Sequence, residues 1–254
     1  MSNEIGVALD GPLARITIRR PPLNILTTAM LREIARAFDA AASSPGIRAV
    51  RLDAEGKAFS AGVDVADHAG SAIEPMMDAL VELFDAAGRV PVPTIAVVHG
   101  AALGGGCEIA LATDLCLAAE RASFGQPEIR LGVFAPPASV LLPRLVGERR
   151  AMGLLLTGET IPASEAASMG LVNRVFPDAT FSAEVDGFID RLLALSGEAL
   201  RQAKRAILAA RARPAGEAHR ELRRIYLDEL MSTHDAQEGI RSFMEKRSPR
   251  WEHR

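Results

Sequence analysis

Two glutamates, Glu108 and Glu128, could do acid–base chemistry if the fold brought their side chains together. Glu108 follows three consecutive glycines and precedes apolar residues. A buried carboxylate without a partner is costly, so a lone glutamate there faces either solvent or a site. Glu128 follows a proline, where a carboxylate can simply stabilise the start of a helix. As a pair, the two could serve as a general acid and a general base.

Two loops could supply backbone donors beside these carboxyl groups. They span Lys57–Val65 and His99–Glu108, and each follows an apolar run that predicts a buried strand. Strand ends of this kind are the usual ligand face of α/β folds. Glycines 104–106 leave N–H groups uncovered at a helix start, which suits an oxygen that gains negative charge. They could equally form a tight turn without a ligand, and their spacing matches neither a dinucleotide fingerprint nor a phosphate loop.

The elements that must position these groups alternate between strands and helices in the first half of the chain. This alternation predicts a parallel, layered α/β structure. The expected elements are a hairpin of Val7–Leu9 and Ala14–Ile18 across Asp10-Gly11-Pro12, a helix capped by Thr27 or Thr28, a strand over Ala49–Leu52, a helix over 74–88 and a strand over Pro93–Val98. From about Pro162 onward helical patterns dominate. These are Phe181–Leu195, Glu198–Arg213, Glu217–Met231 and a last helix through Lys246 that starts at a capping-box-like Asp235…Glu238.

Composition excludes several classes of function. The 254 residues carry a net charge of −3 and only three lysines, which disfavours nucleic acid as a partner. Charged residues interrupt the apolar stretch Pro93–Leu117, so we expect no membrane span. Met1-Ser2-Asn3-Glu4 shows no signal peptide, and two cysteines make no disulfide framework, so we expect a cytoplasmic protein. His99, His219, His234 and His253 lack metal-ligand spacing. His68 could reach the site, but a histidine on the surface or one that satisfies its loop is the favoured interpretation.

The combined pattern resembles the enoyl-CoA hydratase/isomerase (crotonase) superfamily over nearly the whole chain. The matching pieces are Lys57–Val65, Gly100–Glu108, Phe124–Glu128, Leu156–Val172 and Glu238–Arg247. The resemblance implies an α/β fold, a crotonase-like spiral of ββα units over residues 1–190. It also implies a helical C-terminal oligomerisation region over residues 191–254, which makes homotrimers or dimers of trimers.

The resemblance also implies roles for individual residues. The N–H groups of Ala61 and Gly105 would form an oxyanion hole for an acyl-CoA thioester. Glu128 would have the larger proton-transfer role, while Glu108 would hold and activate water. The expected CoA- and substrate-binding residues are Pro22, Leu23, Lys57, Ala58, Gly62, Val63, Asp64, Gly104, Phe134, Phe243 and Lys246. Phe243 and Lys246 match tail positions near the CoA of an adjacent subunit. Asp64 is expected to fix its loop as a hydrogen-bond acceptor. No metal is expected, and no cofactor beyond the CoA moiety of the substrate.

Retention of both carboxyl groups favours a hydratase (a hydro-lyase) that adds water to a conjugated enoyl- or dienoyl-CoA. An enoyl-CoA isomerase, which commonly uses one acid–base residue, and an acyl-CoA thioester hydrolase remain alternatives. A non-catalytic RNA-binding relative would need a basic patch. The loop Gly132–Ser139, with two prolines and the bulky Phe134, departs from the glycine-rich stretch of straight-chain hydratases. With the tail, it resembles the cyclohexa-1,5-diene-1-carbonyl-CoA hydratases of aromatic compound degradation, which implies a pocket for a flat ring.

Overall fold

The computed structural model describes residues 4–9, 11–211 and 213–254. The expectations for residues 1–3 and for the turn residue Asp10 therefore lie outside the described residues. The chain forms two compact units. The core unit comprises Met1–Val90 and Thr94–Asp186, and the helical unit comprises Pro91–Pro93 and Gly187–Arg254. Within the described ranges, no helix is both long enough and apolar enough to cross a membrane.

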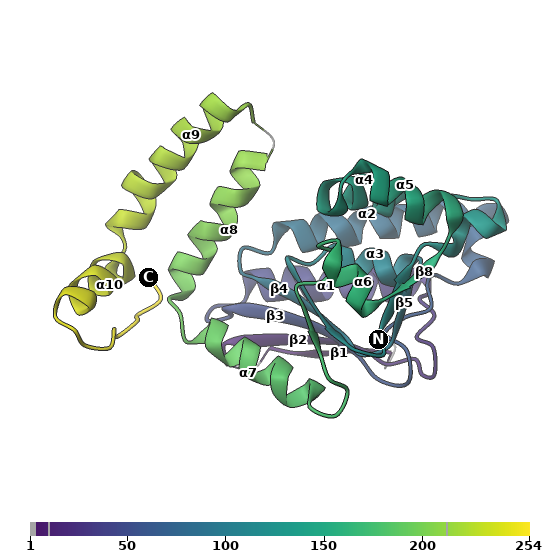
Figure 1. Ribbon diagram of the computed structural model, residues 1–254, viewed down its shortest axis with the longest axis horizontal. Helices are drawn as coiled ribbons and strands as arrows, with labels where there is room; N and C mark the ends of the chain where they lie inside the picture. The colour runs from purple at the N-terminus through teal and green to yellow at the C-terminus, as the bar shows by residue number, and fades with distance from the viewer. Residues whose placement is uncertain (1–3, 10, 212) are drawn as a thin grey trace. The chain divides into compact units, whose positions relative to one another are not determined.

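A six-stranded sheet organises the core unit, and Figure 1 shows β1–β4 lying side by side. Its strands, in spatial order, are β1 Ile5–Ala8, β2 Leu13–Ile18, β3 Ala49–Ala54, β4 Thr94–Val98, β6 Leu115–Ala119 and β9 Arg174–Phe176. The β1–β2 pair is antiparallel, which confirms the predicted hairpin, and every later pair is parallel. The edge strand β9 was not predicted, because it has only three residues and lies among helical patterns.

The helices α1 Thr28–Ser43 and α2 Ile73–Arg89 pack against each other beside this sheet. Thr27 is the N-cap of α1, and its side chain accepts a hydrogen bond from the Met30 N–H at 3.3 Å. The cap satisfies a backbone donor that the first turn leaves without a partner. Both predicted helices are therefore confirmed, and of the two threonines Thr27 is the cap.

A second, three-stranded sheet carries the segments of interest. It joins β5 Ala101–Leu103 to β7 Ser123–Gly125 in parallel, and β7 to β8 Thr160–Pro162 in antiparallel. Its strands β5, β7 and β8 are followed by the helix α3 Gly105–Leu111, the 3₁₀ turn Pro127–Leu131 (η3) and the helix α6 Ala163–Ser168. The core unit also contains the 3₁₀ turns Val65–His68 (η1) and Gly70–Ala72 (η2) and the helices α4 Pro136–Val146 and α5 Glu148–Thr157. The small sheet therefore places the start of α3 beside the start of η3.

The segment Gly132–Ser139 was predicted to be a loop, but it is a loop only as far as Ala135. Pro136 and Pro137 occupy the first two positions of α4. Proline fits there because its fixed φ is helical and its missing N–H would have no partner within the helix. The two prolines thus begin a helix rather than stiffen a loop.

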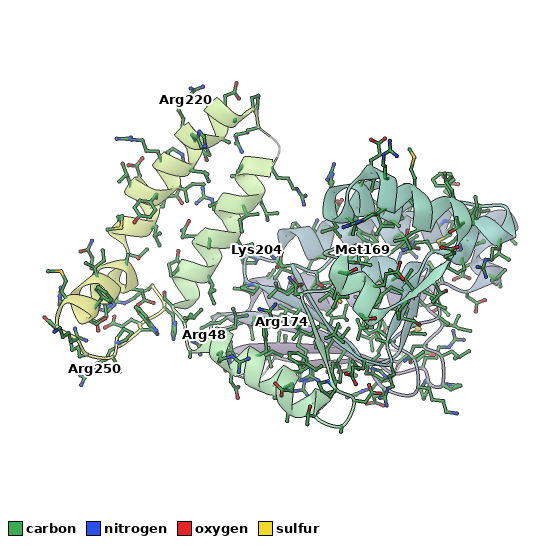
Figure 2. The ribbon with its side chains drawn as sticks, in the orientation of Figure 1. Arg48, Met169, Arg174, Lys204, Arg220 and Arg250 are labelled. Carbon is green, nitrogen blue, oxygen red and sulfur yellow. The ribbon has the colours of Figure 1, made fainter. Side chains whose placement is uncertain are left out.

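The helical unit contains the later part of α7 Phe181–Leu193, then α8 Gly197–Arg211, α9 Ala215–Arg224, a π turn Ile225–Glu229, a 3₁₀ turn Leu230–Ser232 and α10 His234–Met244. The single helix predicted over Glu217–Met231 is therefore divided. Arg220 and Arg250 are exposed on this unit (Figure 2).

The capping box predicted at Asp235 and Glu238 is wrong. Thr233 caps α10 by accepting from the Ala236 N–H at 3.1 Å. The Asp235 carboxylate is buried and instead accepts from the N–H groups of Glu252 and His253 at 2.8 and 3.0 Å. Burial explains the exchange, because a buried carboxylate needs strong donors and the C-terminal tail supplies them.

Candidate active site

The two loops singled out in the sequence lie against each other. The Ser60 N–H donates to Ala101 O at 3.0 Å, and the Leu103 N–H donates to Ser60 O at 2.9 Å. Two glycines of the second loop permit this approach. A Cβ on Gly105 would collide with the Val63 side chain, and a Cβ on Gly106 with Ser60. The glycine run therefore has a packing reason of its own, in addition to any role in binding.

The donors of the site differ from those that the sequence predicted. The Ala61 N–H donates to Leu23 O at 2.9 Å, so the prediction that it receives a thioester oxygen is wrong. The N–H group that lies beside Gly105 belongs to Val63. The Val63 nitrogen is 3.4 Å from the position that a Cβ on Gly105 would take. Among the described residues, neither the Val63 N–H nor the Gly105 N–H has an acceptor. The pair can therefore donate to an oxygen placed between the loops.

Glu108 lies in the first turn of α3 and is only 2% exposed, so it faces the interior rather than solvent. Its Oε1 accepts a hydrogen bond from the Ala138 N–H at 2.9 Å. Burial, together with the charge of Glu128, raises the pKa of Glu108 to about 8 against the opposing effect of the Ala138 hydrogen bond. Glu108 can therefore hold a proton at neutral pH.

Glu128 lies in η3 and is half-buried. Its Oε1 lies against the Cα of Gly104, and its Oε2 is buried without a hydrogen-bond partner among the described residues. Burial raises the pKa of Glu128, while its own backbone N–H and the nearby His68 lower it. The segments that carry the two carboxyl groups are held together because β5 pairs with β7, and the Gly104 N–H donates to Gly125 O at 2.9 Å.

Hydrogen bonds join the two N-terminal segments predicted to contact CoA, although Ala58 is only 3% exposed. Pro22 O accepts from the N–H groups of Lys57 and Ala58 at 3.2 and 3.4 Å, and Leu23 is 46% exposed. Asn24 holds the segments together, because its buried amide donates to Ala58 O at 2.8 Å. The sequence drew attention to this segment without showing that Asn24 fastens it.

The Val65–His68 turn follows directly after the Val63 donor. Asp64 caps it by accepting from the Ala66 N–H at 3.1 Å, which matches the loop-fixing role expected of Asp64. The Nδ1 of His68 lies 3.0 Å from Asp64 O, so this histidine hydrogen-bonds within its loop, as expected. Its effect on the pKa of Glu128 also places it near the carboxyl pair.

The remaining predicted residues are spread over the two units. Phe134 precedes α4 in the core unit and is 67% exposed. Phe243 and Lys246 belong to the helical unit. Phe243 is 85% exposed, and Lys246 has a positive φ of 54° just after α10.

Gln126 was missed by the sequence analysis. It is 1% exposed, and neither its Oε1 nor its Nε2 has a partner among the described residues. A buried amide without a partner is unfavourable unless a ligand or water satisfies it. The available signal was a polar residue between the apolar Phe124-Gly125 and Pro127.

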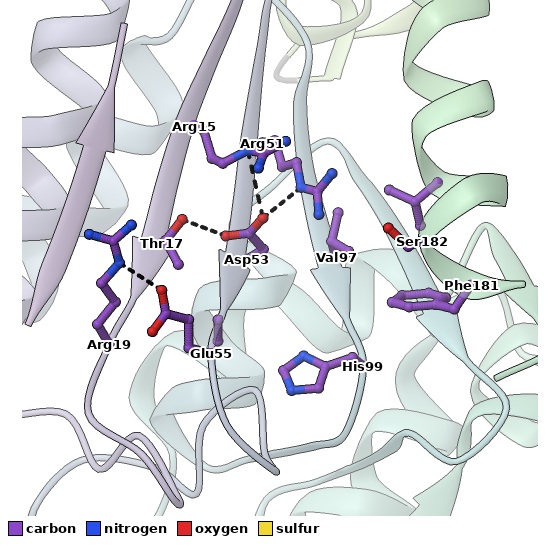
Figure 3. Close-up of a pocket in the computed structure, with 12 residues that line it drawn as sticks. Arg15, Thr17, Arg19, Arg51, Asp53, Glu55, Val97, His99, Phe181 and Ser182 are labelled. Carbon is purple, nitrogen blue, oxygen red and sulfur yellow. Dashed lines mark hydrogen bonds and ion pairs between the residues drawn. The ribbon is translucent and has the colours of Figure 1, made fainter. Parts of the chain in front are cut away.

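A separate cavity of about 330 Å³ lies on the large sheet beside the start of α7 (Figure 3). Its charged groups neutralise each other: Arg51 pairs with Asp53 at 2.6 Å, and Arg19 with Glu55 at 2.9 Å. None of the predicted catalytic residues lines it. In the described part of the chain, no group of three His, Cys, Asp or Glu side chains is arranged to hold a metal ion.

Comparison with known proteins identifies the family of the chain. The family model of enoyl-CoA hydratase/isomerase matches residues 10–254. The cyclohexa-1,5-dienecarbonyl-CoA hydratase of Thauera aromatica is 40% identical over 96% of this chain and 95% of its own length. A probable enoyl-CoA hydratase of Mycobacterium bovis is 37% identical, with 98% and 97% covered. The crystal structure of enoyl-CoA hydratase from Mycobacterium smegmatis superposes with a TM-score of 0.93 at 31% identity, with 98% and 99% covered. The chain therefore belongs to the enoyl-CoA hydratase/isomerase family and has its crotonase-like α/β fold.

Proposed function

We propose that this enzyme adds water across the double bond of a conjugated enoyl-CoA thioester. One observation carries the proposal: the buried Glu108 and the half-buried Glu128 lie beside two adjacent backbone donors, Val63 and Gly105, that have no acceptor among the described residues. Donors without acceptors suit an oxygen that becomes negative, and paired carboxyl groups suit proton transfer on either side of it.

The N–H groups of Val63 and Gly105 are the proposed oxyanion hole. As water attacks the β-carbon, the electrons of the double bond move toward the thioester oxygen, and these donors stabilise the resulting enolate. Loss of one such donor typically costs about 100- to 1000-fold in rate. The correction from Ala61 to Val63 moves the first donor two residues along the same loop.

Hydration needs one carboxyl group protonated and one ionised. Glu108 is the favoured carrier of that proton at rest, so the proton is proposed to pass to Glu128 through the bound water before the reaction. The ionised Glu108 then holds the water and takes its proton, while Glu128 delivers a proton to the α-carbon. Burial raises the pKa of both groups, and the charge of Glu128 further disfavours ionisation of Glu108, so the pair as a whole favours a state with a single proton at neutral pH. The pair carries one proton before and after the reaction, because it takes one from water and gives one to carbon.

The CoA moiety is proposed to lie along Pro22, Leu23, Lys57 and Ala58. The hydrogen bonds from Lys57 and Ala58 to Pro22 hold these two segments together, and Pro22, Leu23 and Lys57 are the exposed residues among the four. The acyl end would then pass the loop residues Gly62, Val63, Asp64 and Gly104. Phe243 and Lys246 are proposed to reach the CoA of a neighbouring subunit.

A ring dienoyl-CoA is the proposed substrate, in line with the name of the Thauera aromatica relative. Support comes from the segment after η3, where Phe134 and a helix start with two prolines replace a flexible glycine-rich loop. A rigid wall of this kind suits a flat, inflexible ring better than an extended chain.

The helical unit is proposed to assemble the chain into homotrimers or dimers of trimers. Large apolar side chains are exposed on it, which suits burial against other copies. They are Leu195, Ile207, Leu208, Tyr226, Leu227, Ile240, Phe243 and Met244. Light scattering should give a mass that is a multiple of three chains, and a monomer would contradict this.

The decisive experiment incubates the protein with a panel of straight-chain and cyclic enoyl-CoA esters. Hydration should remove the absorbance of the conjugated thioester and raise the product mass by one water, fastest with the ring dienoyl ester. Release of free CoA thiol would instead indicate a hydrolase. A shifted double bond at unchanged mass would indicate an isomerase.

A further inference from the structure

The start of α4 is poor in backbone donors. The first four N–H groups of a helix have no partner within the helix, and they usually stabilise any anion placed there. In α4 the first two positions are Pro136 and Pro137, which have no N–H. The third position, Ala138, is therefore the first that can donate.

The donor that remains is directed at the catalytic pair. The Ala138 N–H donates to Glu108 Oε1 at 2.9 Å, and this is the one hydrogen bond that the described residues give to the Glu108 side chain. Ala138 is fully buried and Ala135 is 2% exposed. The Ala138 N–H and the Glu108 carboxyl group thus meet in the interior, while Pro136 and Pro137 are partly exposed.

We infer that Pro136 and Pro137 are positioning residues for the acid–base pair: by keeping N–H groups out of the first turn of α4, they limit how strongly the helix start stabilises the Glu108 carboxylate. The pair then keeps its single proton into the alkaline range. The catalytic consequence rests on the proposed hydratase function, but the effect on protonation does not.

In the described part of the chain, no other charged group on the elements around Glu108 stabilises its carboxylate, so the helix start determines how strongly it is stabilised. Among the elements that pack on α3, β4 and β5 carry no titratable side chain, and the one charged residue of α4 is Arg144, in its last turn. Glu128 acts in the opposite sense, since its charge raises the pKa of Glu108. The burial that raises this pKa to about 8 is opposed only by the Ala138 donor.

The test is a titration of the Glu108 carboxyl carbon by NMR in protein labelled with ¹³C at glutamate, assigned with Glu108→Gln. Pro137→Ala restores an N–H in the first turn, so the titration midpoint should fall by about one pH unit. Pro136→Ala should lower it in the same direction. Pro143→Ala, in the same helix but far from its start, is the matched control and should leave the midpoint unchanged.

The activity measurement uses the same variants. If the proposed hydratase function holds, Pro137→Ala should lose activity at a lower pH on the alkaline side than the wild type and Pro143→Ala. A midpoint that does not move in folded Pro136→Ala and Pro137→Ala would overturn the inference. A shifted midpoint in a protein that hydrates no enoyl-CoA ester would support the inference and refute the proposed function alone.

Discussion

Gly104 and Glu128 share one small space, because the Glu128 carboxyl group lies where a side chain on residue 104 would have to be. Gly104 also has a positive φ of 51°, which side chains disfavour. The first glycine of the run is therefore tied to the position of the Glu128 carboxylate, the proposed acid, twenty-four residues later in the chain.

Gly104→Ala should displace Glu128 and lower kcat by about 100-fold or more, the value of a well-placed acid or base. Gly46→Ala is the matched control. Gly46 has a similar positive φ of 85°, but a Cβ there would meet no atom within 4 Å. Both variants carry backbone strain, so a comparable loss of kcat in the control would mean that strain, rather than displacement of Glu128, is the cause.

Glu128→Gln should retain the binding of a CoA ester while kcat falls by about 100- to 10,000-fold, because the amide cannot exchange a proton in the reaction. Glu165→Gln, an exposed glutamate on α6, should behave like the wild type. Calorimetric binding of the hydrated product and steady-state kinetics measure the two effects separately. Undiminished hydration by Glu128→Gln would refute its role.

Glu108→Gln should make the protein more stable at alkaline pH although it is less active. Burial raises the pKa of Glu108 from its ordinary 4.5 to about 8, so the folded state binds the proton more tightly than the unfolded state. Stability that depends on this proton is complete below pH 4.5 and is lost as pH rises through 8. Denaturant melts should show that the free energy of unfolding of the variant, relative to the wild type, increases by on the order of a few kcal/mol between pH 5 and pH 9. A constant difference would contradict the raised pKa.

Gln126→Leu should separate a binding role from a packing role. An unpartnered buried amide costs about 1–3 kcal/mol, so leucine should preserve or raise the stability of the ligand-free protein. If substrate or water satisfies the amide during turnover, kcat/KM should fall about tenfold. Thermal melts and kinetics on the same preparation provide the test, and unchanged kcat/KM would assign Gln126 to the core.

The sequence sufficed where a signal is local. Thr27 caps α1, and Asp64 holds its own turn through a neighbouring N–H, as predicted. Glu108 and Glu128 were recognised as a pair from residue type, loop context and family resemblance. The structure adds the contact that joins them, the pairing of β5 with β7.

The sequence failed where a partner is distant. The Ala61 N–H donates to Leu23 O, and the Asp235 carboxylate accepts from the C-terminal tail. Neither group is therefore free for the role that its motif suggested. The strand β9 exists because β6 offers it an edge to pair with. Such competition for hydrogen-bond partners depends on the folded chain and leaves no periodic pattern in the amino-acid sequence.

The pairing of β5 with β7 has an evolutionary consequence. The spacing of the two carboxyl groups is set by neighbouring strands, about 4.8 Å apart, and by the hydrogen bond from Gly104 to Gly125. Among the described residues, the segment 132–139 donates one hydrogen bond to the side chains of this pair, from the Ala138 N–H to Glu108, and the Val133 N–H donates to the backbone oxygen of Glu128 at 3.3 Å. A lineage could therefore exchange that segment and acquire new acyl groups without rebuilding its proton-transfer machinery, provided that one backbone donor survives at the helix start.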